Sequence, residues 1–203
     1  ATRTSAVTMD TAARGAGDTT DLRVARLRGG MEVAILSDTH VPSRAERLPA
    51  WVLDRCRAAD HVLHAGDFDS PAALATVREA AGGAAKLTAV RGNTDPPSVG
   101  LPREASVDLG GVTFVLVHGD GPPYGYADRV ARTVRERAGS DAGAVGVAGH
   151  THEHADERVD GVRLLNPGTA TGASPGTETT MLVARATDGD LDVSLRRPPA
   201  GDD

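Results

Sequence analysis

The chain has 203 residues, of which 39% are hydrophobic and 25% charged, a composition that suits one folded domain with a sizeable core. Its formal net charge of −6 argues against a duplex nucleic-acid binder, because such a protein needs a basic face. Aromatic residues make up only 2%, so the core must be built from Ala, Val and Leu. Cys56 is the single cysteine, which excludes an intramolecular disulfide and a cysteine-based zinc site.

Residues 1–30 are rich in Thr, Ala, Gly, Arg and Asp without apolar periodicity, which predicts a disordered or loosely attached extension. Met31 stands directly before the first apolar run and is an alternative translation start. We expect a single domain over residues 31–197 and a frayed acidic tail over residues 198–203. No apolar run approaches the ~20 residues of a membrane span, and no signal-peptide core is evident, so a cytoplasmic protein without a membrane partner is expected.

From residue 31 onward, strand-like and helix-like segments alternate, which indicates an α/β fold. The expected strands cover residues 32–37, 61–65, 86–90, 104–109, 112–117, 144–148, 162–165, 181–186 and 191–196. The expected helices cover residues 45–59, 71–81 and 126–138. Ser70 predicts an N-cap for the second helix, with Pro71 at its first position. Gly110-Gly111 and Asp188-Gly189 predict the turns of two β-hairpins.

Five of the predicted strands end in residues that are able to bind a metal ion. These residues are Asp38 and His40, then Asp67, Asn93, His118, and finally His150 and His152. In α/β sheets, sites form outside the carboxyl ends of the strands, so we expect the seven side chains to converge. Glycines stand beside them at Gly66, Gly92, Gly119 and Gly149, and they allow tight turns that aim the neighbouring side chains inward.

Two Asp, one Asn and four His are more ligands than one zinc ion uses, because a tetrahedral site is full with about four. They fit two divalent ions that share one carboxylate. Imidazole together with oxygen ligands suits Mn²⁺, Fe²⁺ or Zn²⁺ better than Ca²⁺ or Mg²⁺. Two such ions ~3.5–4 Å apart are able to clamp a phosphate, which predicts metal-assisted hydrolysis of a phosphate ester.

The same residues resemble the sequence blocks of the calcineurin-like metallophosphoesterases. The blocks are Asp38-Thr39-His40, Gly66-Asp67, Gly92-Asn93-Thr94-Asp95, His118-Gly119 and Gly149-His150-Thr151-His152. Within that superfamily the chain is similar to the small YfcE-type phosphodiesterases, relatives of the retromer subunit Vps29. The segment Asn166-Pro167-Gly168-Thr169 is similar to the Asn-Pro-Gly-Ser segment of that small family. The similarity extends over about residues 31–190.

The resemblance implies a four-layer α-β-β-α sandwich of two mixed sheets flanked by helices. It places one ion on Asp38, His40, Asp67 and His152, and the other on Asp67, Asn93, His118 and His150. It makes Asp67, Asn93 and His118 catalytic as well, and Asp67 the bridge between the ions. The implied cofactors are two divalent ions, with Mn the first expectation and Zn, Fe or Ni as alternatives. The implied reaction is hydrolysis of a small phosphodiester by hydroxide held between the ions, in a protein that could form a homodimer.

The chain departs from the superfamily pattern at two positions. Thr94 stands where larger members carry a histidine that protonates the leaving group, and Asp120 stands where small members often carry a histidine. Threonine cannot act as a general acid near neutral pH. A Vps29-like scaffold without turnover, or a phosphomonoesterase or nucleotidase of the same superfamily, therefore stays open as an alternative, with a nuclease the least favoured.

Several other polar residues lie near the blocks without a predicted metal role. We interpret His61, His64 and His154 as hydrogen-bonded structural residues. Arg44 and Arg91 could contact a substrate phosphate, although pairing with nearby carboxylates is the simpler interpretation. We expect the Asn166 segment to form a tight structural loop beside the site.

Overall fold

The computed structural model describes residues 30–139, 141 and 143–200, so the predicted extension over residues 1–30 lies almost entirely outside it. The strands are β1 (Met31–Leu36), β2 (His61–His64), β3 (Leu87–Ala89), β4 (Glu104–Leu109), β5 (Val112–Val117), β6 (Val145–Val147), β7 (His154–Val159), β8 (Val162–Pro167), β9 (Met181–Thr187) and β10 (Asp190–Arg196). The helices are α2 (Ala50–Ala58), α3 (Pro71–Ala80) and α4 (Tyr126–Ala138), with short 3₁₀ helices η1 (Ala84–Lys86) and η2 (Pro97–Val99). None of the helices in the described ranges is long and apolar enough to cross a bilayer.

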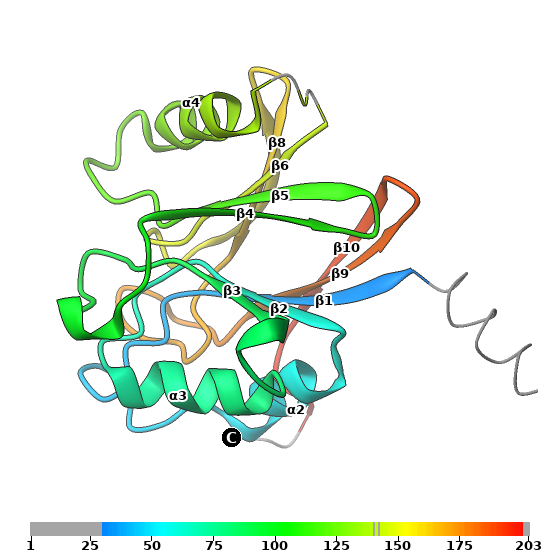
Figure 1. Ribbon diagram of the computed structural model, residues 1–203. Coiled ribbons are helices and arrows are strands. Elements are labelled where there is room, and N and C mark those ends of the chain that lie inside the picture. The colour runs from blue at the N-terminus through cyan, green and yellow to red at the C-terminus, as the bar shows by residue number, and fades with distance from the viewer. Residues whose placement is uncertain (1–29, 140, 142, 201–203) are drawn as a thin grey trace, which may run out of the picture.

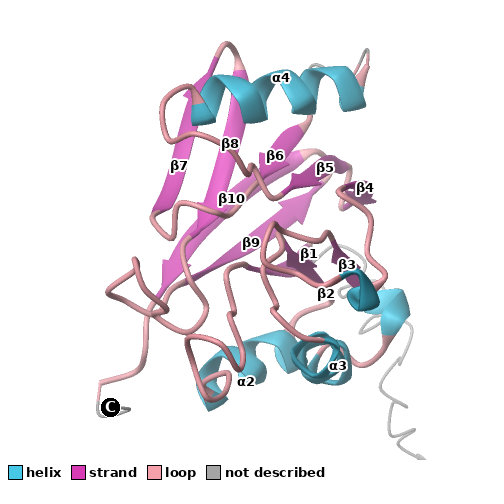
Figure 2. Ribbon diagram, turned by 90° about the vertical axis from the view of Figure 1, so that its left-hand side faces the viewer, coloured by secondary structure: helices cyan, strands magenta, loops and turns pink. Residues whose placement is uncertain are grey.

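Two five-stranded mixed sheets face each other, which confirms the predicted α-β-β-α sandwich (Figure 1). One sheet has the order β10-β9-β1-β2-β3 and is covered on its outer face by α2 and α3. The other has the order β4-β5-β6-β8-β7 and is covered by α4. Strands β1, β2 and β3 run parallel in the first sheet, and β5, β6 and β8 run parallel in the second. Figure 2 views the molecule from the side where the loops after β1, β2 and β3 emerge.

The central strands are buried on both faces, because each face packs into a different apolar layer. In β1, Val33 and Ile35 belong to the layer between the sheets, whereas Ala34 and Leu36 pack against the layer under α2 and α3. In β5, Phe114 faces the other sheet and Val115 faces α4. The core consists mainly of Ala, Val and Leu, as the composition predicts.

Most element boundaries are confirmed, but two predictions were wrong. The first helix begins at Ala50 rather than residue 45, because Pro49 holds an extended conformation and disfavours helix at the residue before it. Strand β7 was not predicted, since its polar sequence lacks the alternation of a half-buried strand. It is an edge strand, joined to β8 by a turn at Asp160 and Gly161, both with positive φ.

Candidate metal centre

The loops that follow the parallel strands are tied to one another by backbone hydrogen bonds. After β1 and β2, the Asp38 N–H donates to Gly66 O at 3.0 Å and the His40 N–H donates to Asp67 O at 3.0 Å. In the second sheet, the Gly149 N–H donates to His118 O at 3.1 Å. The two sheets meet at this edge, because the His150 N–H donates to Asp38 Oδ2 at 3.0 Å. All seven predicted ligand residues stand on the loops that follow these strands.

The first group of ligand atoms is formed by Asp38, His40 and His152, whose atoms all lie within 4.8 Å of one another. The Nε2 atoms of His40 and His152 are 3.1 Å apart. Asp38 Oδ1 lies 3.2 Å from His152 Nε2 and 3.8 Å from His40 Nε2. All three residues are buried.

The second group is centred on His118 and Asn93. His118 Nε2 lies 3.2 Å from Asp67 Oδ2 and 3.1 Å from Asn93 Oδ1, and His150 Nδ1 lies 3.0 Å from the same Asn93 oxygen. Asp67 Oδ2 also lies 3.6 Å from His40 Nε2, so this carboxylate stands between the two groups. Asp38 is close to Asp67 and His118 as well, within 4.8 Å.

Three of the imidazoles are oriented by an acceptor at Nδ1. His118 donates to Ala65 O and His152 to Ala173 O, each at 2.8 Å, while His40 donates to the carboxylate of Asp69 at 3.0 Å. With the proton on Nδ1, the Nε2 lone pair of each ring faces the centre. Two such lone pairs 3.1 Å apart repel unless a cation lies between them. The donor set therefore fits divalent metal ions.

The backbone at these loops is held in an unfavourable conformation. Among the residues that the structure describes, eight non-glycine residues have positive φ, and the set includes five of the seven predicted ligands: Asp38, His40, Asp67, His150 and His152. Such angles cost of order 1–3 kcal/mol each and persist where the surroundings fix them, typically at functional sites. The positive-φ non-glycine residues of the chain are thus concentrated in the loops that carry the predicted ligands.

Neighbouring glycines allow the close approach of these loops. Gly66 and Gly119 have positive φ, at 99° and 88°, which matches the tight turns expected of them. Gly92 and Gly149 are needed for a different reason. A Cβ on Gly92 would collide with the Asp67 carboxylate, and a Cβ on Gly149 would collide with the Ser37 hydroxyl.

The protein groups alone polarise the centre strongly. Burial by itself would raise the pKa of Asp38, but the neighbouring His152 and His40 rings, in their protonated form, outweigh it and hold that pKa below its usual value. Burial would also raise the pKa of Asp67, yet its hydrogen bond with His118 lowers it. Conversely, burial would lower the pKa of His118, but Asp67 and the charge of Asp38 raise it to about 9. Among the described residues, neither carboxylate has an arginine or lysine partner, so their ion pairs are with imidazoles alone.

Two acidic residues, Asp69 and Asp95, support the centre, although the sequence patterns predicted no role for them. Asp69 accepts from His40 and from the hydroxyls of Ser43 and Thr94. Asp95 accepts the backbone N–H groups of Asp67, Phe68, Asp69 and Gly92 at 2.8–3.0 Å, and so fixes the Asp67 loop against the Asn93 loop. Their sequence positions could have indicated this role, because Asp69 and Asp95 each stand two residues after a predicted ligand, Asp67 and Asn93 respectively.

The two departures from the superfamily pattern have defined places. Thr94 donates its N–H to Asp67 Oδ1 at 3.0 Å and its hydroxyl to Asp69, so it holds one predicted ligand and one supporting carboxylate. Asp120 pairs with Arg103 at 3.6 Å.

The Asn166 segment supports the site, as expected, although Asn166 itself lies in β8 rather than in a loop. Its Nδ2 donates to Gly149 O at 3.0 Å and to Thr151 Oγ1 at 2.9 Å, which fixes the loop that carries His150 and His152. The Thr169 hydroxyl donates to Asp38 O at 2.8 Å.

The remaining histidines contact structural partners. His61 Nε2 lies 2.9 Å from Thr88 Oγ1. His64 is fully buried, stacks on Phe68, and contacts Thr39 Oγ1 at 2.8 Å, and burial lowers its pKa to about 3. His154 is exposed at the start of β7.

The described part of the chain holds no carboxylate partner for Arg44 or Arg91, contrary to the simpler interpretation of the sequence. Arg44 donates to Ser174 O at 2.9 Å, and within the described residues neither Arg44 nor Arg91 forms an ion pair.

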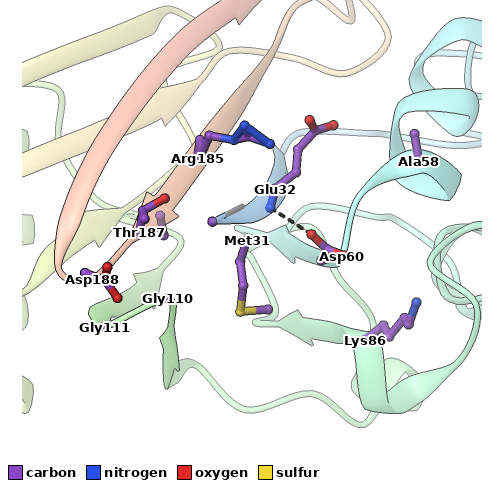
Figure 3. Close-up of a pocket in the computed structure, with 12 residues that line it drawn as sticks. Met31, Glu32, Ala58, Asp60, Lys86, Gly110, Gly111, Arg185, Thr187 and Asp188 are labelled. Atoms are coloured by element: carbon purple, nitrogen blue, oxygen red, sulfur yellow. Dashed lines mark hydrogen bonds between the residues drawn. The ribbon is translucent and has the colours of Figure 1, made fainter. Parts of the chain in front are cut away.

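A cavity of ≈ 700 Å³ lies at the N-terminal end of β1, whereas the predicted ligands follow its C-terminal end (Figure 3). Lys86, Arg185 and Asp188 line it, and Asp60 Oδ2 accepts the Glu32 N–H at 3.0 Å beside it. It contains none of the predicted ligands, and it borders Gly30, where the described part of the chain begins. Size alone therefore does not identify the site.

A sandwich of two mixed sheets with a histidine–carboxylate centre at the strand ends defines an α/β metalloprotein of the phosphoesterase type. Residues 31–189 match the calcineurin-like phosphoesterase superfamily domain, and the chain belongs to that superfamily, whose members use divalent metals. A probable metallophosphoesterase of Methanothermobacter thermautotrophicus is 31% identical over 171 residues, which cover 84% of this chain and 94% of the relative.

Solved structures show the same fold. Zn²⁺-bound wild-type Vps29 from Entamoeba histolytica is 26% identical with a TM-score of 0.66, covering 83% of this chain and 98% of Vps29. An archaeal phosphodiesterase is 23% identical with a TM-score of 0.58, covering 82% of this chain and 100% of that protein.

Proposed function

We propose that this metallophosphoesterase is a phosphodiesterase that binds two divalent ions. The observation that supports the proposal is the position of Asp67 Oδ2, which lies 3.6 Å from His40 Nε2 in one cluster of predicted ligands and 3.2 Å from His118 Nε2 in the other. Asp38, His40, Asp67 and His152 would hold one ion. Asp67, Asn93, His118 and His150 would hold the other. Mn²⁺ is the first candidate, and Zn²⁺, Fe²⁺ or Ni²⁺ would suit the same ligands; the Zn²⁺ on the similar Vps29 supports the metal role of the site.

Divalent ions at such a site acidify water and neutralise the charge that develops on a phosphoryl group. The chain's contribution is to hold the ligands without reorganisation. Asp95 and Thr94 fix Asp67, while Asp69, Ala65 O and Ala173 O fix the imidazoles. Preorganised groups of this kind stabilise a transition state at little cost when the reaction occurs.

The exposure of the ligands indicates how a substrate approaches. Asn93 is exposed and His150 is half-buried, whereas the other five ligands are buried. A phosphodiester therefore meets the second group first, at Asn93 and His150.

Leaving-group chemistry is the weak point of this active site. The Thr94 hydroxyl is already donated to Asp69, and a threonine holds no titratable proton near neutral pH. We infer a preference for esters whose leaving groups need no protonation. This preference favours activated diesters in an assay.

The test is to remove metals from the full chain, add Mn²⁺, and compare hydrolysis of bis(p-nitrophenyl) phosphate with that of p-nitrophenyl phosphate. Metal content is measured on the same samples. We expect Mn²⁺-dependent hydrolysis, faster for the diester, with two ions per chain. Faster hydrolysis of the monoester would replace the proposal with a phosphomonoesterase.

A scaffold is the second candidate, because the similar Vps29 structures share the fold and Thr94 leaves the site without the superfamily's acid. Two bound ions without hydrolysis of either ester would favour it.

A further inference from the structure

A small cavity of ≈ 180 Å³ lies against the loop that follows β5, and three arginines from different parts of the chain line it. Arg91 comes from the loop after β3, Arg103 from the segment before β4, and Arg129 from α4. We call this cavity the arginine pocket. In a chain with a net charge of −6, three guanidinium groups around one cavity are an unusual concentration of positive charge.

The arginine pocket adjoins the exposed side of the metal centre. Arg91 stands two residues before Asn93, and Gly119, which lines the pocket, directly follows His118. In the same loop, Gly121 O lies 3.2 Å from His150 Nε2. The pocket is therefore next to the ligands that a substrate meets first.

Much of the positive charge in the arginine pocket is not neutralised. Among the described residues, Arg91 and Arg129 form no ion pair. Arg129 Nη2 donates to Gly119 O and Pro122 O at 3.1 and 3.2 Å, and Nη1 donates to Gly125 O at 3.4 Å. Its buried Nε has no hydrogen-bond partner within the described part of the chain. A buried N–H of a charged group that lacks an acceptor is costly, so an anionic ligand would be favourable here.

Two carboxylates also line the pocket and limit its affinity. Asp120 pairs with Arg103 at 3.6 Å, and both side chains are substantially exposed, so this pair is weak. Glu104 has no ion-pair partner among the described residues. Three guanidinium groups against two carboxylates leave a net positive site.

We propose that the arginine pocket binds a second phosphate group of the substrate, attached near the phosphodiester that is cleaved. This inference rests on the proposed phosphodiesterase function. Guanidinium groups match the geometry of phosphate oxygens through paired N–H donors, which a hydrophobic or neutral leaving group would not use. The site thus selects diesters that carry an additional terminal phosphate.

The first test concerns binding alone. The metal-free full chain is titrated with inorganic phosphate, and the Nε–Hε signals of the arginines are followed by NMR. We expect saturable shifts at Arg91, Arg103 and Arg129. Arg91→Gln should weaken the response, and Glu104→Gln should strengthen it. Arg132→Gln, on the exposed side of α4, removes the same charge outside the pocket and should leave the phosphate-induced shifts unchanged.

The second test uses the Mn²⁺-loaded chain with two nitrophenyl esters of thymidine 5′-phosphate, one of which carries a 3′-phosphate. We expect a lower KM for the phosphorylated ester. Arg91→Gln should raise that KM roughly tenfold or more, as expected for loss of a charge-assisted hydrogen bond, and leave the KM of the other ester unchanged.

The two tests separate the two proposals. Absence of shifts at the three arginines, or an equal loss in Arg132→Gln, would refute the arginine pocket. Equal KM values for the two esters would refute its role in substrate selection. If neither ester is hydrolysed while phosphate still shifts Arg91, the phosphodiesterase proposal fails and the phosphate site stands.

Discussion

Asp67 is the residue on which both ligand groups depend, because its Oδ2 lies 3.6 Å from His40 Nε2 and 3.2 Å from His118 Nε2. We predict that Asp67→Asn weakens the binding of both ions and abolishes hydrolysis, since the shared negative charge is lost. Metal affinity should fall by at least the ~10–100-fold that loss of an outer-shell partner costs. Metal content and Mn²⁺-dependent hydrolysis measure this. Asp54→Asn, in an exposed surface pair, is the control; unaltered activity in Asp67→Asn would contradict the two-ion assignment.

The proposed preference for leaving groups that need no protonation rests on Thr94. We predict that Thr94→His raises turnover of diesters with alkyl leaving groups, because general acid catalysis contributes typically ~10²–10⁴-fold. Turnover of nitrophenyl diesters, whose leaving groups need no proton, should change little. Thr94→Val, which removes only the hydroxyl donated to Asp69, separates loss of that hydrogen bond from gain of an acid. A similar change for both classes of ester would reject a missing acid as the limiting factor.

At the scale of elements, α3 offers a direct test of local sequence signals. Ser70 Oγ accepts the Ala73 N–H at 3.1 Å and donates to Val41 O at 2.8 Å, so it caps the helix and anchors the His40 loop. We predict that Ser70→Ala costs about 1 kcal/mol of unfolding free energy, or roughly 2–4 °C in Tm for a domain of this size. Thermal unfolding measures it, with the exposed Ser98→Ala as the control.

Elements were predictable where a strong local signal existed. The turns at Gly110-Gly111 and Asp188-Gly189 have positive φ at both residues, as hairpins of this kind require. The start of α2 was mispredicted because apolar spacing was weighed above Pro49. Strand β7 was missed because the partner that defines it, β8, is not visible in its own polar sequence.

At the scale of the whole molecule, convergence of the ligands was predictable because parallel strands bring their carboxyl ends to one edge. The orientation of the rings was not predictable. His118 and His152 are fixed by the backbone carbonyls of Ala65 and Ala173, and any residue offers a carbonyl. The arginine pocket was hidden for the same reason, since Arg91, Arg103 and Arg129 meet only when both sheets and α4 are assembled.

The coupling of metal binding to folding yields a pH-dependent prediction for the whole molecule. Without added metal, the pKa of His118 is raised from 6.5 to about 9. Protonated His118 therefore stabilises the fold fully at a pH below 6.5, and this stabilisation is lost as the pH rises through about 9. The pKa of His40 is also raised, which acts in the same direction. Asp38 and Asp67 have lowered pKa values, so their contributions are lost only in acid.

Metal affinity depends on pH in the opposite direction and rises with pH, because an imidazole must be unprotonated to bind a metal ion. We predict that the Tm of the Mn²⁺-loaded chain exceeds that of the chelated chain, and that the difference grows between pH 6.5 and pH 9. An ion at 100 times its Kd adds about 2.7 kcal/mol, which corresponds to roughly 5–10 °C for a domain of this size. Thermal unfolding with Mn²⁺ or chelator across this range measures it. His154→Asn, at an exposed position, should keep the same pH dependence, and His118→Asn should flatten it. A difference that shrinks as the pH rises would exclude His118 as a metal ligand.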